Sequence, residues 1–423
     1  MITFRAKLKG GYLLMDIQKI LKKIKETPTP KVNKVAVAYS GGLDSSLAIE
    51  LLRRKYKARS ILPITLDVGQ GEEEVLESRR KAKVLKIRPL FFDLRKEFTE
   101  VWIAKAIQAN SDYLGYPVST SMTRQIVARK VAEVALNEGC DAILEGSSGK
   151  GNDQYRMHNV FKMFAPSLKV LVPVRDFDLT RLEEEALCRE WGVPVTEMIT
   201  GGDDKTMWCR SIASGAIDLN QPLPDQIWMW YQSPEKSPDQ PASLTLEFEK
   251  GIPVQLNGKR LPLGKIIPEL NVIGGTHGIG KIDMFEDGIM DLKSREIYEA
   301  PAATIILKLH RDLEQFCLTK DEIQFKKGVD QKWAFLVYHG MAYHPLRYDL
   351  DWFIEATQKV VNGKYKIKLY KGNIEIVHRE SRTSLFSPEI RSIKTTGFDQ
   401  RRCADAAFIR GLPFEILARR KMR

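Results

Sequence analysis

Short apolar segments alternate with amphipathic segments through the first half of the chain. Apolar, β-branched runs predict strands over residues 34–39, 60–68, 89–93, 142–145 and 170–174. Between them, apolar residues recur at helical spacing, which predicts helices over residues 45–56, 71–85, 97–109 and 122–139. Strands that alternate with helices through short connections indicate a parallel sheet covered on both faces. We therefore expect an α/β domain over residues 34–200.

The pattern changes after about residue 200. The segment 222–243 is rich in proline, which predicts a linker between domains. Beyond it, the sequence predicts paired strands around a turn at Gly251 and helices over 263–273 and 305–316. A further hairpin turns at Lys371-Gly372-Asn373. This mixture predicts an α+β second domain over residues 201–408, followed by a C-terminal helix over residues 409–423.

Residues 1–33 form an N-terminal extension in this division. Apolar residues recur there at helical spacing and predict a short amphipathic helix: Leu14, Ile17, Ile20, Leu21 and Ile24. The apolar run is short and broken, and no small-residue cleavage site follows it. The segment therefore does not resemble a signal peptide.

Composition favours a globular protein in a reducing compartment. The 423 residues exceed what one hydrophobic core usually organises, and 43% of them are hydrophobic. The five cysteines contain no CxxC pair, which argues against a zinc site and a disulfide scaffold. The chain also has no apolar stretch long enough to span a membrane. We expect a cytoplasmic protein with no membrane contact.

The chain is basic, with 66 Lys and Arg against 54 Asp and Glu and a formal charge of +12. A basic excess raises the local concentration of anionic ligands such as ATP. The positive residues are spread widely, and no basic run is interleaved with aromatic residues. Nucleic acid is therefore not the expected partner.

The first predicted strand ends in the segment Ser40-Gly41-Gly42-Leu43-Asp44-Ser45-Ser46, and a helix follows. Backbone N–H groups at a helix N-terminus bind anions, and the two glycines let the backbone approach phosphates. The serines can donate hydroxyl hydrogen bonds, and Asp44 can cap the helix or act through Mg²⁺. No Gly-Lys-Ser/Thr follows, so this is not a Walker A loop. The segment resembles the SGGxDS/T signature of the ATP pyrophosphatase superfamily; the alternative is a plain helix-capping turn.

A second glycine-rich loop spans Glu145 to Gln154 and also follows a predicted strand. Lys150 supplies a cation for phosphate or carboxylate, and Asn152 and Asp153 can hold an amine. Alone, such a loop is also typical of a surface turn. Two glycine-rich loops at the carboxyl edge of one parallel sheet predict a single shared site.

Seven segments together resemble the argininosuccinate synthase family, in order along the chain. They are AYSGGLDSS (38–46), LDVGQGEE (66–73), YPVSTSMTR (116–124), GKGNDQYR (149–156), GGTHGIGKID (274–283), LKSREIYEAPAATI (292–305) and LYKGN (369–373). The resemblance covers nearly the whole chain from residue 34 to about residue 408. The first thirty or so residues lie outside it.

The resemblance implies an ATP-dependent ligase of arginine biosynthesis with an adenine nucleotide alpha hydrolase-like domain. The ureido oxygen of citrulline would attack the α-phosphorus of ATP, giving citrullyl-AMP and pyrophosphate. The amine of aspartate would then displace AMP and give argininosuccinate. The resemblance further implies ATP and Mg²⁺ as the cofactors, no metal held by protein ligands alone, and a homotetramer.

The resemblance also assigns the site residues. Those expected to bind ATP are Ala38, Tyr39, Ser40, Gly41, Gly42, Leu43, Asp44, Ser45, Ser46, Leu66 and Gly146. Those expected to bind citrulline or a similar acceptor are Tyr116, Ser121, Asn152, Arg156, Ser211, Glu286 and Tyr298. Those expected to bind aspartate are Thr120, Ser148, Asn152 and Asp153. Catalytic roles are expected for Asp44, Ser40 and Lys150.

Several positions depart from the family pattern. Thr123-Arg124-Gln125 stands where Ala-Arg-Pro is usual, and Glu145 stands where the family has His. A serine that helps to bind citrulline is replaced by Gly202, and Lys205 replaces an acidic residue in the predicted acceptor pocket.

These departures leave two alternatives to the family reaction. The first is a paralogous ligase that adenylates a different ureido, amide or carboxylate acceptor. The second is an RNA-modifying enzyme with the same nucleotide loop, which the basic charge invites. Against the second stand the missing RNA-binding module and the near full-length resemblance to a small-molecule family.

Overall fold

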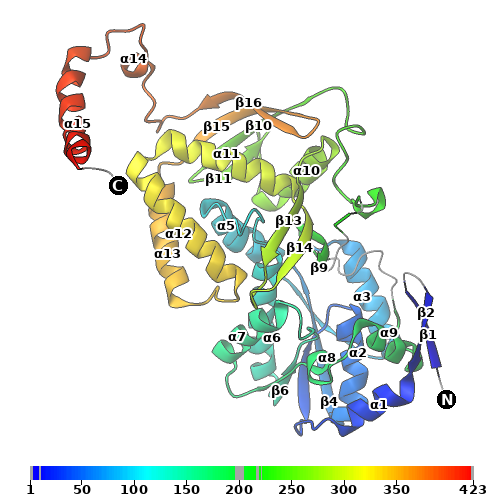
Figure 1. Cartoon of the computed structure of the whole chain (residues 1–423). Helices are drawn as coiled ribbons and strands as arrows, with labels where there is room; N and C mark the ends of the chain where they lie inside the picture. The colour runs from blue at the N-terminus through cyan, green and yellow to red at the C-terminus, as the bar shows by residue number, and fades with distance from the viewer. Residues whose placement is uncertain (1–2, 9–10, 196–203, 216–218, 221, 421–423) are drawn as a thin grey trace. The chain divides into compact units, whose positions relative to one another are not determined.

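The computed structural model describes residues 3–8, 11–195, 204–215, 219–220 and 222–420 (Figure 1). The chain divides into two compact units, residues 1–383 and residues 384–423. The first unit carries the predicted sheet, both glycine-rich loops and the α+β elements.

A five-stranded parallel sheet organises the first part of this unit. Its strand order is β5-β4-β3-β6-β7, and every neighbouring pair is parallel. The strands are β3 (Lys34–Ala38), β4 (Ser60–Asp67), β5 (Leu90–Asp93), β6 (Ala142–Leu144) and β7 (Lys169–Leu171). The predicted α/β class is confirmed. The central strand β3 is apolar on both faces because helices cover both faces.

Alternate residues of β3 face two different hydrophobic clusters, as the two-residue period of a strand requires. Val35 and Val37 pack in a cluster with α2 and α9, whereas Ala36 packs in the cluster that contains α6. The helices of this part are α2 (Leu43–Leu51), α3 (Glu72–Val84), α6 (Thr120–Asn137), α7 (Asp153–Phe164) and α9 (Arg181–Glu190). A π-helical segment, Leu52–Tyr56, extends α2.

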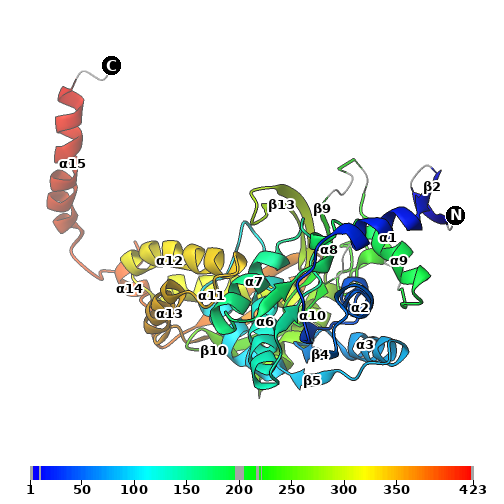
Figure 2. The same cartoon turned by 90° about the horizontal axis from the view of Figure 1, so that it is seen from below.

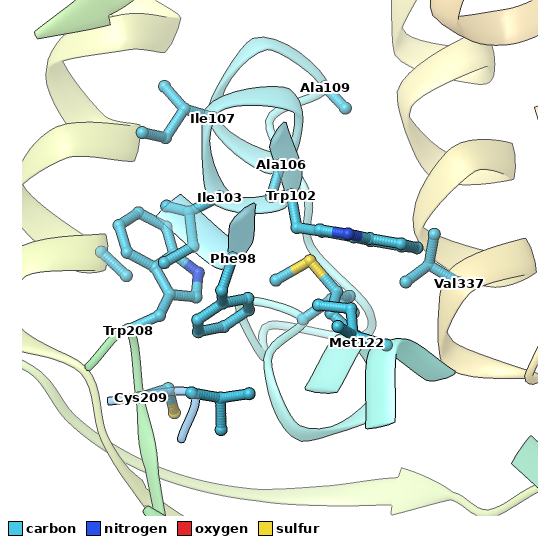
Figure 3. Close-up of a cluster of buried hydrophobic side chains, with 14 of the residues drawn as sticks. Phe98, Trp102, Ile103, Ala106, Ile107, Ala109, Met122, Trp208, Cys209 and Val337 are labelled. Carbon is cyan, nitrogen blue, oxygen red and sulfur yellow. The ribbon is translucent and has the colours of Figure 1, made fainter. Parts of the chain in front are cut away.

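The cluster around α6 continues into the second half of the chain (Figure 3). Its aromatic centre is a helical segment made of α4 (Arg95–Glu97), a π-helical stretch (Phe98–Ile103) and α5 (Ala104–Gln108). Phe98 and Trp102 lie there near Met122 of α6, with Trp208 and Val337 contributed from far along the chain. One continuous core therefore joins the parallel sheet to the elements that follow it.

Among the described residues from 204 to 383 there are two antiparallel sheets and four long helices, so the predicted α+β character is confirmed. One sheet has the order β12-β11-β10-β15-β16 and the other the order β13-β14-β9-β8. The strands of the first are β10 (Ala242–Glu249), β11 (Ile252–Leu256), β12 (Lys259–Arg260), β15 (Gly363–Tyr370) and β16 (Asn373–Glu380). Those of the second are β8 (Asp204–Lys205), β9 (Arg210–Gly215), β13 (Lys281–Asp287) and β14 (Lys293–Glu299). The helices are α10 (Leu263–Thr276), α11 (Pro301–Cys317), α12 (Lys320–Tyr338) and α13 (Pro345–Gln358).

The strand predicted over 170–174 and the predicted N-terminal helix have different bounds in the structure. The strand predicted over 170–174 ends at Leu171, because Pro173 begins the short helix α8 (Pro173–Asp176). Proline suits the first position of a helix, where its missing N–H leaves no bond unmade. The N-terminal helix prediction is wrong for Leu14, which lies in β2 and pairs with Arg5 of β1.

The N-terminal extension forms a hairpin of β1 (Thr3–Leu8) and β2 (Gly11–Asp16), followed by α1 (Ile17–Glu26). Asp16 caps α1 by accepting from the Gln18 backbone N–H at 2.9 Å. Helix α1 lies beside α9 in both views (Figure 1, Figure 2). The Nζ of Lys23 donates to the Asp178 carbonyl oxygen at 2.5 Å, just before α9.

The second unit consists of α14 (Pro388–Arg391), a short 3₁₀ turn over residues 400–402 and α15 (Cys403–Arg419). The C-terminal helix predicted over 409–423 begins earlier, at Cys403, and continues through Pro413. Across the described residues, no helix combines the length and the apolar character needed to cross a membrane.

The apolar face of α1 is expected to stabilise the first unit. Ile20 is buried in the cluster formed with α2 and α9. Replacing it by alanine leaves a cavity, and we expect Ile20→Ala to lower the free energy of unfolding by about 2–5 kcal/mol. The exposed neighbour Lys22 provides the matched control, since Lys22→Ala is expected to change it by less than about 0.5 kcal/mol. Urea denaturation measures both; equal effects would mean that α1 does not pack as described.

Candidate nucleotide and acceptor site

A cavity of about 680 Å³ opens at the carboxyl ends of the parallel strands. This is where open parallel sheets bind ligands. Its wall is formed by the first glycine loop, the end of β4, α3, α6 and the start of the second glycine loop. The lining includes every residue predicted to bind ATP except Ser46, namely Ala38, Tyr39, Ser40, Gly41, Gly42, Leu43, Asp44, Ser45, Leu66 and Gly146. Ser46 is fully buried in α2 behind the loop.

The first glycine loop is held against α3 by close backbone packing. Gly41 has a φ of +79°, and a Cβ placed there would lie 2.6 Å from the Cα of Ser78. From the same helix, the buried Nζ of Lys81 donates to the Gly41 carbonyl oxygen at 2.9 Å. Burial lowers the pKa of Lys81 from its ordinary value. These contacts fix the shape of the loop within the protein itself.

Hydroxyl groups complete the loop. The Gly42 N–H donates to Ser40 Oγ at 3.2 Å, and Ser40 Oγ lies 3.2 Å from Ser45 Oγ. Ser45 Oγ also donates to the Gly42 carbonyl oxygen at 3.2 Å. These are long hydrogen bonds, so the hydroxyls can reorient toward a ligand at small cost.

The prediction that Asp44 caps α2 is wrong. The N-cap of α2 is Gly42, which makes no side-chain capping bond, and Asp44 lies in the first turn. Its Oδ1 instead accepts a hydrogen bond from Arg181 of α9. Burial, and then the nearby Asp44, raise the pKa of Glu184 to about 9.

The second glycine loop approaches the first. A Cβ on Gly146 would lie 3.2 Å from both the Asp44 Cβ and the Ser45 N, so glycine allows the two loops to approach closely without a tight contact. Glu145 is buried behind this contact and accepts from the Ser147 N–H at 2.8 Å. Burial raises the pKa of Glu145 to about 7. Lys150 is exposed and does not line the cavity, so the structure does not bring this predicted catalytic residue to the nucleotide loop.

A second group of predicted site residues is a buried aromatic cluster around Glu286. Tyr298 OH donates to Glu286 Oε2 at 2.9 Å, and Tyr338 OH donates to Glu286 Oε1. Tyr116 stacks on Tyr298 with ring centroids 4.3 Å apart. Burial raises the pKa of Glu286, although both phenols favour its ionised form. The cluster thus presents a buried carboxyl between aromatic faces.

Asp153 lies between this cluster and the nucleotide cavity. Its Oδ1 is 3.0 Å from Arg156 Nη1 and its Oδ2 is 2.7 Å from Arg124 Nε. Desolvation opposes its ionisation, but the two guanidinium groups hold the pKa of Asp153 below its ordinary value. Arg124 also pairs with Asp204, and the Arg156 Nε donates to the Tyr338 carbonyl oxygen at 2.9 Å. One chain of charges therefore runs from the nucleotide cavity to the Glu286 cluster.

The remaining predicted substrate residues lie around the same cluster. Asn152 donates to Tyr338 OH at 3.1 Å and accepts from the Ile289 N–H at 2.8 Å. Thr120 Oγ1 lies 3.3 Å from Tyr116 OH. Ser211 of β9 pairs in register with Tyr298 of β14.

Two predicted substrate serines are placed differently. Ser121 is fully buried in α6, and its carbonyl oxygen accepts from Gln125 at 2.8 Å. Ser148 lies half-buried in the second glycine loop, where its carbonyl oxygen accepts from the Gly151 N–H. Neither contact is to the Glu286 cluster.

The departures from the family pattern fall in different places. Gln125 is buried and links α6 to a distant segment, donating to the Val337 carbonyl and accepting from the Ala342 N–H. Thr123 and Lys205 line the nucleotide cavity, with Lys205 Nζ 3.5 Å from Glu74. The departure at Lys205 therefore lies at the cavity that contains the first glycine loop, and not in the acceptor pocket where it was predicted. Gly202 lies outside the described residues.

Four side chains of the site were not found from the sequence: Lys81, Arg181, Glu184 and Tyr338. The partners of Lys81, Arg181 and Tyr338 lie 40, 137 and 52 positions away along the chain, so no local pattern distinguishes these residues. One local signal was available for α9. Thr180 and Glu183 have the spacing of a capping box, which predicts that the helix begins at Arg181.

The close approach of Gly41 to α3 generates a prediction. Gly41→Ala adds a Cβ that clashes with the Ser78 backbone, and we expect loss of ATP binding in isothermal titration calorimetry. Gly192→Ala is the matched control, because Gly192 also has positive φ, +70°, but a Cβ there meets nothing within 4 Å. Both variants carry a similar backbone strain of about 1 kcal/mol. Equal ATP affinities in the two variants would contradict the role of this contact.

Comparison with known proteins places these features in context. Residues 34–194 match the model of the arginosuccinate synthase N-terminal HUP domain, and residues 202–417 match the arginosuccinate synthase C-terminal domain. The argininosuccinate synthase of Methanopyrus kandleri is 40% identical over 394 residues, covering 92% of this chain and all (100%) of that protein. That of Archaeoglobus fulgidus is 41% identical over 389 residues, covering 91% of this chain and 99% of that protein.

Proposed function

We propose that this chain, which belongs to the argininosuccinate synthase family, joins citrulline to aspartate with ATP and releases AMP and pyrophosphate. Enzymes of this family are ligases that form a C–N bond. The observation that carries the proposal is the chain of charges Arg124–Asp153–Arg156. It connects a glycine-lined cavity suited to a nucleotide with a buried carboxyl suited to an amino acid.

The backbone around the nucleotide cavity supports the proposal that ATP binds there. The first glycine loop leads into the N-terminus of α2, where N–H groups and the helix dipole favour phosphate. Mg²⁺ would be held mainly by the phosphates, because no set of three potential metal ligands gathers among the described side chains. When bound, Mg²⁺ would spread the charge of the leaving pyrophosphate. Ser40 and Ser45 would donate hydroxyl hydrogen bonds to phosphate oxygens.

The side chains of the Glu286 cluster suit an α-amino acid as the ligand. An ionised carboxylate has about four acceptor positions, so the two phenols leave Glu286 able to accept from an α-ammonium group. Arg156 can bind a carboxylate, and Tyr116 presents an aromatic wall. We assign this pocket to citrulline, with Ser121 and Ser211 as predicted further contacts. Thr120, Ser148, Asn152 and Asp153 remain the residues proposed for aspartate.

The reaction then depends chiefly on orientation. The citrulline ureido oxygen forms a bond to the α-phosphorus as the bond to pyrophosphate breaks. The aspartate amine next forms a bond to the ureido carbon as AMP leaves, and the amine loses a proton. Holding three substrates in one connected site supplies much of the rate through positioning. We extend the proposal to a cytoplasmic homotetramer with a nucleotide-binding domain over 34–200 and a substrate domain over 201–408.

The assay that tests the proposal measures pyrophosphate release with ATP, Mg²⁺ and aspartate, with and without citrulline. We expect citrulline to stimulate release, and Asp44→Asn to depress it by roughly 10-fold or more through loss of a charged contact. Release that other ureido, amide or carboxylate compounds stimulate, but citrulline does not, would replace this proposal with a paralogous ligase. A salt-sensitive gel shift with tRNA would favour the RNA-modifying alternative.

The Glu286 pocket generates a separate prediction. Glu286→Gln removes the charge that would bind the citrulline ammonium, so we expect KM for citrulline to rise about 10- to 100-fold. KM for ATP should change little, because Glu286 does not line the nucleotide cavity. Asp287→Asn is the matched control, since Asp287 is next in the strand and pairs with Lys293 at 2.7 Å. A rise in KM for ATP with no change for citrulline would contradict the assignment of this pocket.

A further inference from the structure

Gln125 of α6 joins the end of α12 to the segment that follows it. The side chain is fully buried; its Nε2 donates to the Val337 carbonyl oxygen at 2.8 Å, and its Oε1 accepts from the Ala342 N–H at 2.7 Å. The last four carbonyl groups of a helix have no partner within the helix. Val337 belongs to this last turn of α12, so the Gln125 amide supplies its carbonyl with a partner from another helix.

The same turn is also held from α7. The Arg156 Nε donates to the Tyr338 carbonyl oxygen at 2.9 Å, so the last carbonyl of α12 also has a partner on a neighbouring helix. Gly340 has a φ of +76°, and a Cβ placed there would lie 2.7 Å from the Arg156 Cα. The backbone of the turn therefore lies directly against α7, and glycine permits this approach. Contacts from α6 and α7 thus fix the backbone around Tyr338.

The Tyr338 side chain connects this turn to the Glu286 cluster. Its hydroxyl donates to Glu286 and accepts from the Asn152 Nδ2 at 3.1 Å, so one group joins the two side chains. The Arg156 guanidinium lies 4.7 Å from the centroid of the Tyr338 ring, and Tyr113 stacks on this ring with centroids 3.8 Å apart. A shift at the end of α12 would therefore move the phenol relative to three side chains of the proposed citrulline pocket.

We propose that Gln125 is a positioning residue for acceptor binding: by holding the end of α12 it fixes Tyr338, whose hydroxyl orients Glu286. Gln125 does not line the nucleotide cavity, and its side chain bonds to backbone groups of α6, of the end of α12 and of the segment after it. Its effect on a ligand therefore passes through the protein. The inference rests on the proposed function for the identity of the acceptor, whereas the hydrogen bonds do not depend on it.

A first pair of variants separates positioning from stability. Gln125→Met keeps a side chain of similar length and removes the hydrogen bonds to the end of α12. We expect KM for citrulline to rise about 10-fold, as for a weakened hydrogen bond to a charged group, and KM for ATP to change little. Gln358→Met is the matched control, because Gln358 is also buried and makes hydrogen bonds to Glu314 and His310 at the end of α13. The control should lower the melting temperature and leave KM for citrulline unchanged.

A double-mutant cycle tests whether Gln125 acts through the Tyr338 hydroxyl. Tyr338→Phe keeps the ring but removes the hydroxyl, so it should raise KM for citrulline by itself. In this background we expect Gln125→Met to raise KM by less than about threefold, because the two residues act through one contact. Tyr343→Phe is the control for a buried phenol, since the Tyr343 hydroxyl has no hydrogen-bond partner within the described part of the chain. Independent effects of Gln125→Met and Tyr338→Phe would overturn the proposal.

Gln125→Asn covers the case in which the Met variant does not fold. It keeps an amide on a side chain that is shorter by a methylene group, so it cannot span both backbone groups. KM for citrulline should rise in the same direction as in the Met variant. The proposal is overturned if neither variant raises KM for citrulline more than Gln358→Met does.

Crystal structures of the wild type and of Gln125→Asn test the same point without an acceptor. We expect the Tyr338 hydroxyl to leave its position on Glu286 in the variant; an unchanged hydrogen bond would overturn the proposal. A failure of citrulline to stimulate pyrophosphate release from the wild type would instead contradict the proposed function, and it would leave this structural comparison intact.

Discussion

The site depends on one constraint, the approach of two glycines to their neighbours at the carboxyl edge of the parallel sheet. Gly41 lies against the backbone of α3, and Gly146 lies against Asp44 and Ser45. A side chain at Gly41 would displace the backbone of α3, and a Cβ at Gly146 would make unusually tight contacts with Asp44 and Ser45. The two contacts hold the first loop against α3 and the second loop against the first. Both loops line the nucleotide cavity.

Charged side chains then link this cavity to the Glu286 cluster. Asp153 is shared by two arginines, one on the nucleotide side and one beside the Glu286 cluster. A substrate carboxylate that binds Arg156 competes with Asp153 for the same guanidinium. Its arrival would therefore free part of the Asp153 carboxylate for an amine and change the field at Arg124. Through this shared carboxylate, binding at the Glu286 cluster could change the affinity of the nucleotide cavity for its ligand.

The sequence predicts features that depend on neighbours along the chain. The parallel strands, the hairpin at Gly372 and the first glycine loop follow from local periodicity and turn residues. Contacts between distant segments follow from packing and have no local signal: Tyr338 reaches Glu286 across 52 residues, and Arg181 reaches Asp44 across 137. Leu14 was misassigned for the same reason, since pairing between two strands outweighs helical spacing in so short a segment.

The position of each departure bears on the identity of the acceptor. Gln125 makes two buried hydrogen bonds that join α6 to the end of α12 and to the segment just after it, so it links protein segments on either side of Tyr338. Thr123, Glu145 and Lys205 all line the nucleotide cavity. The cluster of Tyr116, Arg156, Glu286, Tyr298 and Tyr338 carries none of the named departures and keeps its buried carboxyl. Because substrate choice is set by the groups that a substrate must pair, the acceptor site proposed at this cluster would favour citrulline over an acceptor that lacks an α-ammonium group.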